Sequence, residues 1–202
     1  MYLSKVMVTG AACRNPYEIH RSLWQLFPED PDARRDYLFR VERAGRQQAE
    51  ILLQSQRKPS DSELRKVRLL ATRGYQPRLQ QGQRLRFALL ANPVKTINDE
   101  RGRLNAKGQV KKCRVPLIRE EEWRSWLEHK LIGCAELETL VAENRLPINF
   151  RKPKEKRVGK IQPVSFQGIL RVSSPEAMMQ AISTGIGPAK AFGCGLLSIA
   201  PA

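Results

Sequence analysis

The stretch Gly185-Ile-Gly-Pro-Ala-Lys-Ala-Phe-Gly-Cys-Gly195 organises the chain, because two Gly-apolar-Gly pairs bracket a five-residue insert with one lysine and one phenylalanine. Glycine suits positions where the backbone takes a positive φ or lies close to another backbone. A cationic loop of this kind could present bare N–H groups to a chain of phosphates. It is not the dinucleotide-binding pattern, which has another glycine spacing and follows the first strand of a βαβ unit. Glycine spacing alone favours a helix C-cap and a tight turn into a last strand.

The charge of the chain points to a polyanionic partner. Lysine and arginine number 36 against 20 aspartates and glutamates, which gives a net charge of +16 over 202 residues. No fold requires such self-repulsion, so the partner is either nucleic acid or an acidic membrane. A membrane surface is the weaker choice, because the basic residues fall in loops and hairpins rather than along one amphipathic helix. The start of the chain lacks a signal-peptide pattern, and no apolar run approaches the ~18 residues of a membrane span.

The cysteines and histidines do not form a metal-binding pattern. No two cysteines have the C-x-x-C spacing, and only His20 and His129 accompany them. The cysteines are Cys13, Cys113, Cys134 and Cys194. We therefore expect a reduced, cytoplasmic protein with no metal and no cofactor.

The N-terminal half predicts a β-α-β-β-α-β order, which is the ferredoxin-like plan that RNA-recognition domains also use. Alternating or apolar runs predict strands at residues 2–9, 37–42, 49–55 and 84–91. Asn15 and Pro16 are good N-cap and N1 residues for a helix over 15–27. A capping box at Ser60–Glu63, with Leu64, Val67 and Leu70 behind it, predicts a second helix.

The second half predicts a rougher copy of the same plan. Asn92-Pro93 breaks the preceding strand, and a basic run follows. Helices are predicted at 120–131, with Trp123 and Trp126 as core residues, and from Ser174 onward. Further strands are predicted at 161–172 and 196–200, with a basic arm at 151–160. The expected architecture is α+β with two tandem ferredoxin-like domains: residues 1–91, a basic linker at 92–115, and residues 116–202.

Tyr17 and His20 lie one turn apart on the same face of the first predicted helix. Two interpretations are open at this point. His20 falls within the apolar arc, so it could be a buried, hydrogen-bonded core histidine. It could equally act as a general acid or base beside a tyrosine at the edge of a groove. His129 lies between Glu128 and Lys130 on a polar side, so we expect an ordinary surface histidine.

Several motifs in order resemble one family over essentially the whole chain. They are MYLSKV at 1–6, Tyr17-x-x-His20-x-x-x-Trp24-x-Leu26-Phe27-Pro28, Leu89-x-Ala91-Asn92-Pro93-x-Lys95-Thr96, Cys113-Arg-Val-Pro-Leu117, and Gly185 to Ser198. Together these resemble the CasE family, the CRISPR precursor-RNA endoribonucleases of type I-E Cascade. The regions 44–48 and 134–160 carry little of the resemblance.

The resemblance implies a metal-independent endoribonuclease that cuts CRISPR repeat RNA at the 3′ base of its stem-loop. The 2′-OH attacks the phosphate, giving a 2′,3′-cyclic phosphate and a 5′-OH. The protein then stays on the crRNA hairpin as a monomeric Cascade subunit, so each molecule turns over once. In the family, a histidine and a tyrosine on the first helix form the catalytic pair, matching His20 and Tyr17. The glycine-rich loop is a family hallmark, matching Gly185, Gly187, Gly193 and Gly195.

We expect RNA binding to be mainly electrostatic, with the shape of the hairpin read through its phosphates. The candidate RNA contacts are the basic residues of the linker, the arm and the glycine-rich loop. They are Lys95, Arg101, Arg103, Lys111, Lys112, Arg114, Arg151, Lys152, Lys154, Lys156, Arg157, Lys160 and Lys190.

Two other functions compete with this one. A non-catalytic RNA hairpin-binding subunit of a ribonucleoprotein would keep the fold without cutting, and the intact Tyr17/His20 pair argues against it. A DNA-binding regulator is less favoured, because no helix-turn-helix with a basic recognition helix is present.

Overall fold

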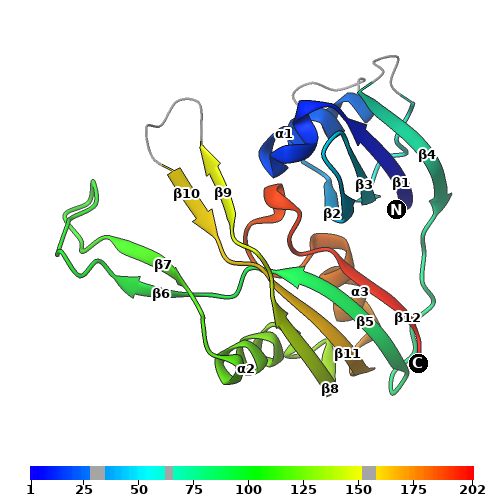
Figure 1. Cartoon of the computed structure of the whole chain (residues 1–202). Helices are drawn as coiled ribbons and strands as arrows, with labels where there is room; N and C mark the ends of the chain where they lie inside the picture. Colours follow the sequence, from blue (N-terminus) through cyan, green and yellow to red (C-terminus); the bar gives the residue numbers. More distant parts are fainter. Residues whose placement is uncertain (28–34, 62–65, 152–157) are drawn as a thin grey trace.

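The chain folds into two four-stranded antiparallel sheets, each with helices on one face (Figure 1). The computed structural model describes all residues except 28–34, 62–65 and 152–157. Within the described residues the strands are β1 (Tyr2–Thr9), β2 (Tyr37–Ala44), β3 (Gln48–Ser55), β4 (Val67–Gly74), β5 (Arg84–Ala91), β6 (Val94–Asn98), β7 (Lys112–Pro116), β8 (Ala135–Asn144), β9 (Ile148–Arg151), β10 (Val158–Ile161), β11 (Val164–Val172) and β12 (Leu197–Pro201). The α-helices are α1 (Pro16–Leu23), α2 (Glu120–Leu131) and α3 (Pro175–Thr184).

Both sheets have the strand order of the ferredoxin-like fold. The first sheet is ordered β2-β3-β1-β4, and the second β12-β5-β11-β8. When only the strands of each four-stranded sheet are numbered along the chain, both orders read 4-1-3-2. Helices α1, α2 and α3 occupy crossover positions of the β-α-β-β-α-β plan. The expected fold class, two tandem ferredoxin-like domains, is confirmed.

The first helix begins where the sequence predicts. The Asn15 side chain accepts a hydrogen bond from the Tyr17 backbone N–H at 3.0 Å, and Pro16 occupies the first turn. Ile19 and Leu23 are buried under the first sheet. A short 3-10 turn over Trp24–Leu26 continues the helix.

One helix prediction and one strand assignment need correction. The helix predicted after Ser60 is wrong where it can be checked, because Val67 begins strand β4 and 62–65 lie outside the described residues. Pairing with the free edge of β1 overrides the local capping signal. The strand at 84–91 exists, but it pairs with β11 and β12 in the second sheet rather than completing the first.

The residues expected as a linker lie within the second unit. They form the hairpin β6–β7 between β5 and α2, with Val94 opposite Pro116. Figure 1 shows this hairpin and the hairpin β9–β10 projecting from the second sheet. Given these pairings, we propose that the two domains divide within residues 75–83 rather than at residue 91.

Each domain has its own core, and the predicted core tryptophans are confirmed. Phe39, Ile51 and Leu53 belong to the first cluster, while Trp123 and Trp126 belong to the second. Side chains of the first domain donate hydrogen bonds to backbone carbonyl groups of the second domain. Gln54 Nε2 donates to the Ile182 carbonyl at 2.7 Å, and Arg40 donates to the Ala88 carbonyl at 3.2 Å.

The glycine loop, residues 185–195, ends α3 and leads into β12, as the C-cap interpretation predicts. Gly185 is the C-cap residue of α3 with φ of 76°. The idea of bare N–H groups along the loop is wrong at several positions. The N–H of Ile186 donates to the Gly195 carbonyl at 2.9 Å, and that of Gly195 donates to the Leu90 carbonyl at 2.7 Å.

A glycine-to-alanine pair tests the packing of this loop. Gly185 and Gly82 both have positive φ, but only at Gly185 would a Cβ meet other atoms, at 2.8 Å from the Gly195 carbonyl oxygen and from Leu38. Gly82→Ala therefore measures backbone strain alone. We expect Gly185→Ala to lower the free energy of unfolding by about 1–3 kcal/mol more than Gly82→Ala, measured by urea denaturation. Equal losses in the two variants would contradict this packing.

Candidate active site and nucleic-acid interface

Helix α1 places Tyr17 and His20 beside the glycine loop. The rings of Tyr17 and Phe192 have centroids 6.4 Å apart, and α1 contacts the 3-10 turn Lys190–Phe192. Gly193 lets the loop lie on Phe39, because a Cβ there would be 3.3 Å from the Phe39 ring. Phe39 in turn lies 6.5 Å from the His20 ring. The two predicted catalytic side chains therefore lie next to the junction between the domains.

The His20 side chain is surrounded by aromatic rings. Its ring centroid lies 5.7 Å from that of Tyr37 and 6.4 Å from that of Trp24. The Tyr37 hydroxyl donates to the His20 backbone carbonyl at 2.8 Å, which fixes the helix against β2. The ring is only partly buried, yet its Nε2 atom is shielded from solvent and has no hydrogen-bond partner among the described residues. A core histidine would normally have that partner.

The electrostatic surroundings of His20 favour its neutral form. Burial, and then the positive charge of Arg35, lower the pKa of His20 to about 4. At neutral pH the imidazole therefore carries no charge and keeps one nitrogen able to accept a proton. Burial and Arg35 also lower the pKa of Lys190. Arg35 thus lies close enough to act on both the first helix and the glycine loop.

An aromatic contact connects the arm to this site. Phe150 of β9 packs on Phe192 with ring centroids 4.3 Å apart. Gly159 of β10 faces Phe150 so closely that a Cβ there would be 2.2 Å from the ring. The β9–β10 hairpin is therefore positioned against the loop that contacts Tyr17. Phe150 was not among the site residues predicted from the sequence, and no local pattern marks it.

The predicted RNA-contact residues fall into three groups. Lys95, Arg101, Arg103, Lys111, Lys112 and Arg114 lie on or between β6 and β7, Lys160 lies on β10, and Lys190 lies in the glycine loop. The side chain of Arg151, and Lys152, Lys154, Lys156 and Arg157, lie outside what the structure describes.

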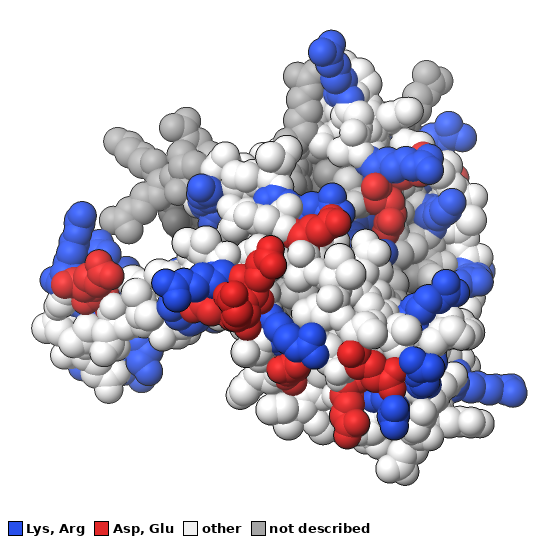
Figure 2. Space-filling view, turned by 60° about the horizontal axis from the view of Figure 1, so that its bottom comes forward, with Lys and Arg blue, Asp and Glu red and all other residues white. Residues whose placement is uncertain are grey.

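Some of these cations already have carboxylate partners. Lys95 pairs with Glu122 at 3.2 Å, and Arg103 pairs with Asp99 at 2.6 Å. The hydrogen bond from Arg103 holds the pKa of Asp99 below its usual value. Figure 2 shows a face on which acidic residues lie beside basic ones, so the excess charge is not spread evenly over that face. Charge counting along the sequence therefore overstates the cations free for a ligand.

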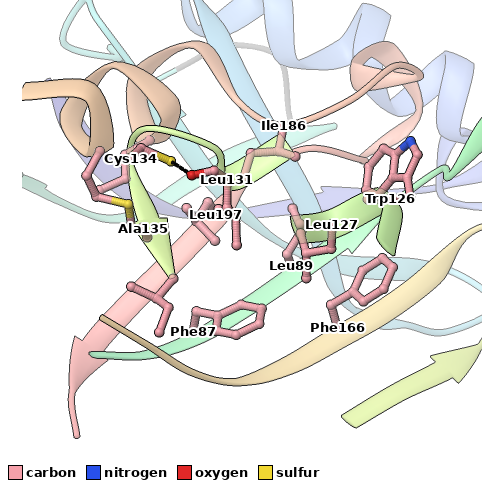
Figure 3. Packing of buried hydrophobic residues seen from close by; sticks show 14 of the residues in the cluster. Phe87, Leu89, Trp126, Leu127, Leu131, Cys134, Ala135, Phe166, Ile186 and Leu197 are labelled. Carbon is pink, nitrogen blue, oxygen red and sulfur yellow. Dashed lines mark hydrogen bonds between the residues drawn. The ribbon is translucent and has the colours of Figure 1, made fainter. Parts of the chain in front are cut away.

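Four basic side chains gather in one hollow of about 640 Å³. Its walls come from β6 and β7, α2, the glycine loop and a residue shortly before β2. The basic residues are Arg35, Arg114, Lys130 and Lys190. Trp126 also lines this hollow. It belongs to the second core cluster (Figure 3). Neither Arg35 nor Lys130 was among the RNA contacts predicted from the sequence.

In the part of the chain that the structure describes, neither a metal-binding cluster nor a membrane-spanning helix is found. Across 1–27, 35–61, 66–151 and 158–202 no group of three or more His, Cys, Asp or Glu side chains could hold a metal ion. None of the described helices combines the length and apolar character that crossing a bilayer would need.

Comparisons with known proteins match the whole chain. The family described as CRISPR associated protein matches residues 1–201. The CRISPR system Cascade subunit CasE of Escherichia coli K12 is 44% identical over 202 residues, covering 100% of both chains. The CRISPR-associated endoribonuclease Cse3 of Thermus thermophilus is 33% identical, again over 100% of both chains.

Solved structures agree with the sequence matches. The crystal structure of Cas6e from E. coli K-12 superposes with a TM-score of 0.85 at 41% identity, covering 100% of both chains. A structure of the CRISPR endoribonuclease Cse3 bound to 19-nucleotide RNA has a TM-score of 0.78 at 32% identity, also covering 100% of both chains. Because the family model matches residues 1–201 and CasE and Cse3 are 44% and 33% identical over their full length, the chain belongs to the CasE family of CRISPR-associated proteins.

Proposed function

We propose that this protein is an endoribonuclease that cuts CRISPR repeat RNA at the 3′ base of its stem-loop. The observation that carries the proposal is the placement of Tyr17 and His20 beside the junction of two RNA-recognition-like domains. The relatives support it, since one is named an endoribonuclease and another a Cascade subunit. The protein acts in the cytoplasm and stays on the crRNA hairpin with other Cascade subunits.

The RNA supplies its own nucleophile, so the protein needs only to position groups, move protons and stabilise charge. The 2′-oxygen forms a bond to the adjacent phosphorus, and the bond from phosphorus to the 5′-oxygen breaks. This leaves a 2′,3′-cyclic phosphate, and the departing 5′-oxygen takes up a proton from water or from His20 once it carries the 2′-OH proton, giving the 5′-OH. No step requires a metal ion.

His20 is the general base in this proposal. Because its lowered pKa keeps it neutral at pH 7, it can accept the 2′-OH proton. The unpartnered Nε2 leaves hydrogen-bonding capacity that an RNA hydroxyl can use once the ring is presented to it. The Tyr17 phenol O–H donates to the scissile phosphate and stabilises its charge.

Removing the imidazole should abolish cutting while leaving binding. We expect His20→Ala to slow cleavage of a repeat hairpin by about 10²–10⁴-fold in buffer with EDTA. Its affinity for the same hairpin with a 2′-deoxy nucleotide at the cut site should stay within about threefold of wild type. His129→Ala is the control, since that histidine is exposed on α2 and should leave the rate unchanged.

Full-rate cleavage by His20→Ala would remove His20 from the mechanism. A wild-type protein that binds the all-ribose hairpin without cutting it would instead support the non-catalytic RNA-binding alternative.

The lowered pKa of His20 also predicts how stability depends on pH. Between pH 6.5 and about 4 the unfolded chain protonates His20 while the folded chain does not. The folded state therefore loses stability as pH falls through this window, on the order of 1 kcal/mol after allowing for solvent at the half-buried ring. Urea unfolding at pH 7 and pH 4.5 should show a larger loss for wild type than for His20→Gln. Parallel losses in the two proteins would contradict the lowered pKa.

A further inference from the structure

The hollow formed by Arg35, Arg114, Lys130 and Lys190 lies between four elements of the second domain, which are β6, β7, α2 and the glycine loop, and one residue of the first. Val94 and Thr96 of β6, Trp126 of α2 and Gly187–Ala189 of the loop complete its lining. None of its ten lining residues is acidic. By contrast, the hollow of about 530 Å³ that includes β12 mixes basic residues with Glu42 and Glu50.

The cations of this hollow have few internal partners. None of the four forms an ion pair with a carboxylate among the described residues; Lys190 donates to the Thr184 carbonyl at 2.7 Å. Lys130 lies over the Trp126 ring at 5.9 Å. Arg35 and Lys190 are close enough that the charge of Arg35 lowers the pKa of Lys190. Four like charges around one hollow repel each other until an anion enters.

The backbone that lines the hollow is firmly held. A Cβ at Gly187 would lie 2.9 Å from the Trp126 ring, so the loop rests directly on this side chain. Ala189 takes a left-handed φ of 64°, the one non-glycine residue with positive φ in the described chain. Such a conformation persists only where the surroundings enforce it, and it occurs often at ligand sites. The hollow is therefore a preformed site rather than a chance gap between mobile lysines.

The hollow is connected to helix α1 by a side-chain contact and by the charge of Arg35. Lys190 begins the 3-10 turn that ends with Phe192, and Phe192 contacts Tyr17. Arg35 acts electrostatically on both His20 and Lys190. A strand whose scissile phosphate lies at Tyr17 and His20 therefore has a cationic path into the hollow.

We propose that this hollow is a subsite for one or two backbone phosphates of the RNA strand next to the cut, with Arg35 joining it to the catalytic helix. The inference rests on the proposed function and adds Arg35 and Lys130 to the residues that bind the RNA. Arg35 and Lys190 take the phosphate nearest the scissile bond, and Arg114 and Lys130 the one beyond it. Thr96 offers an uncharged hydroxyl donor to the same oxygens.

The test couples single phosphates to single side chains. A repeat hairpin with a 2′-deoxy nucleotide at the cut site receives one neutral methylphosphonate at a time, and its affinity is measured for wild type and Lys130→Gln. We expect a methylphosphonate at one or two positions of the hairpin to weaken its binding to wild type about tenfold. The same methylphosphonate should weaken binding to Lys130→Gln less than about threefold, because the side chain that contacts that phosphate is already changed. Lys130→Gln and Arg114→Gln should each lower the slope of log Kd against log salt by roughly 0.7–0.9.

Arg68→Gln is the matched control for loss of one charge. Arg68 lies on β4, the edge strand of the first sheet opposite β2, which contacts the glycine-loop turn. It should keep the wild-type salt slope and methylphosphonate profile. The same profile in wild type and Lys130→Gln, or an equal loss of slope in Arg68→Gln, would overturn the subsite.

A second measurement separates this inference from the proposed function. Inorganic pyrophosphate should raise the unfolding temperature of wild type more than that of Lys130→Gln, whether or not RNA is cut. The subsite alone would be overturned if wild type cuts RNA but differs from Lys130→Gln neither in its methylphosphonate profile nor in its response to pyrophosphate. Wild type that shows the pyrophosphate difference but cuts no repeat RNA would overturn the proposed function alone.

Discussion

The close contact between the glycine loop and the two hydrophobic cores is the constraint on which the rest of the site depends. Gly187 lies against Trp126 of the second core, and Gly193 lies against Phe39 of the first. The loop is held between them by its own backbone hydrogen bonds and by the bond from Gly195 to Leu90. The contacts of the loop with Tyr17, Phe150 and the cationic hollow all follow from this placement.

This arrangement divides the work between the domains. The first domain supplies the helix with Tyr17 and His20, and the second supplies most of the cations and both projecting hairpins. Because RNA carries its own nucleophile, the protein's contribution is alignment, and alignment requires that the domains be fixed relative to each other. Arg35 contributes to both catalysis and phosphate binding. Its charge favours the neutral form of His20, and its side chain lines the hollow where phosphate would bind.

Local signals in the sequence were sufficient for much of the fold. The first helix was predictable from Asn15 and Pro16, and the loop ending α3 from its glycines. Sheet membership was not, because it depends on pairings between residues far apart in sequence. Strand β4, whose residues were expected in a helix, takes the edge of the first sheet that was expected for β5, and β5 pairs in the second sheet. The Tyr17/His20 pair could be predicted because the two residues are one helical turn apart in sequence. The hollow is lined by residues between 35 and 190, so no local sequence pattern predicts it. Ion pairing removed Lys95 and Arg103 from the unpaired cations that charge counting had suggested.

A crystal structure with a repeat hairpin carrying a 2′-deoxy nucleotide at the cut site tests the central claim most directly. We expect the scissile phosphate within about 3–3.5 Å of His20 or Tyr17, with the adjoining strand entering the hollow between α2 and the glycine loop. A scissile phosphate held elsewhere, with helix α1 facing solvent or protein alone, would contradict it.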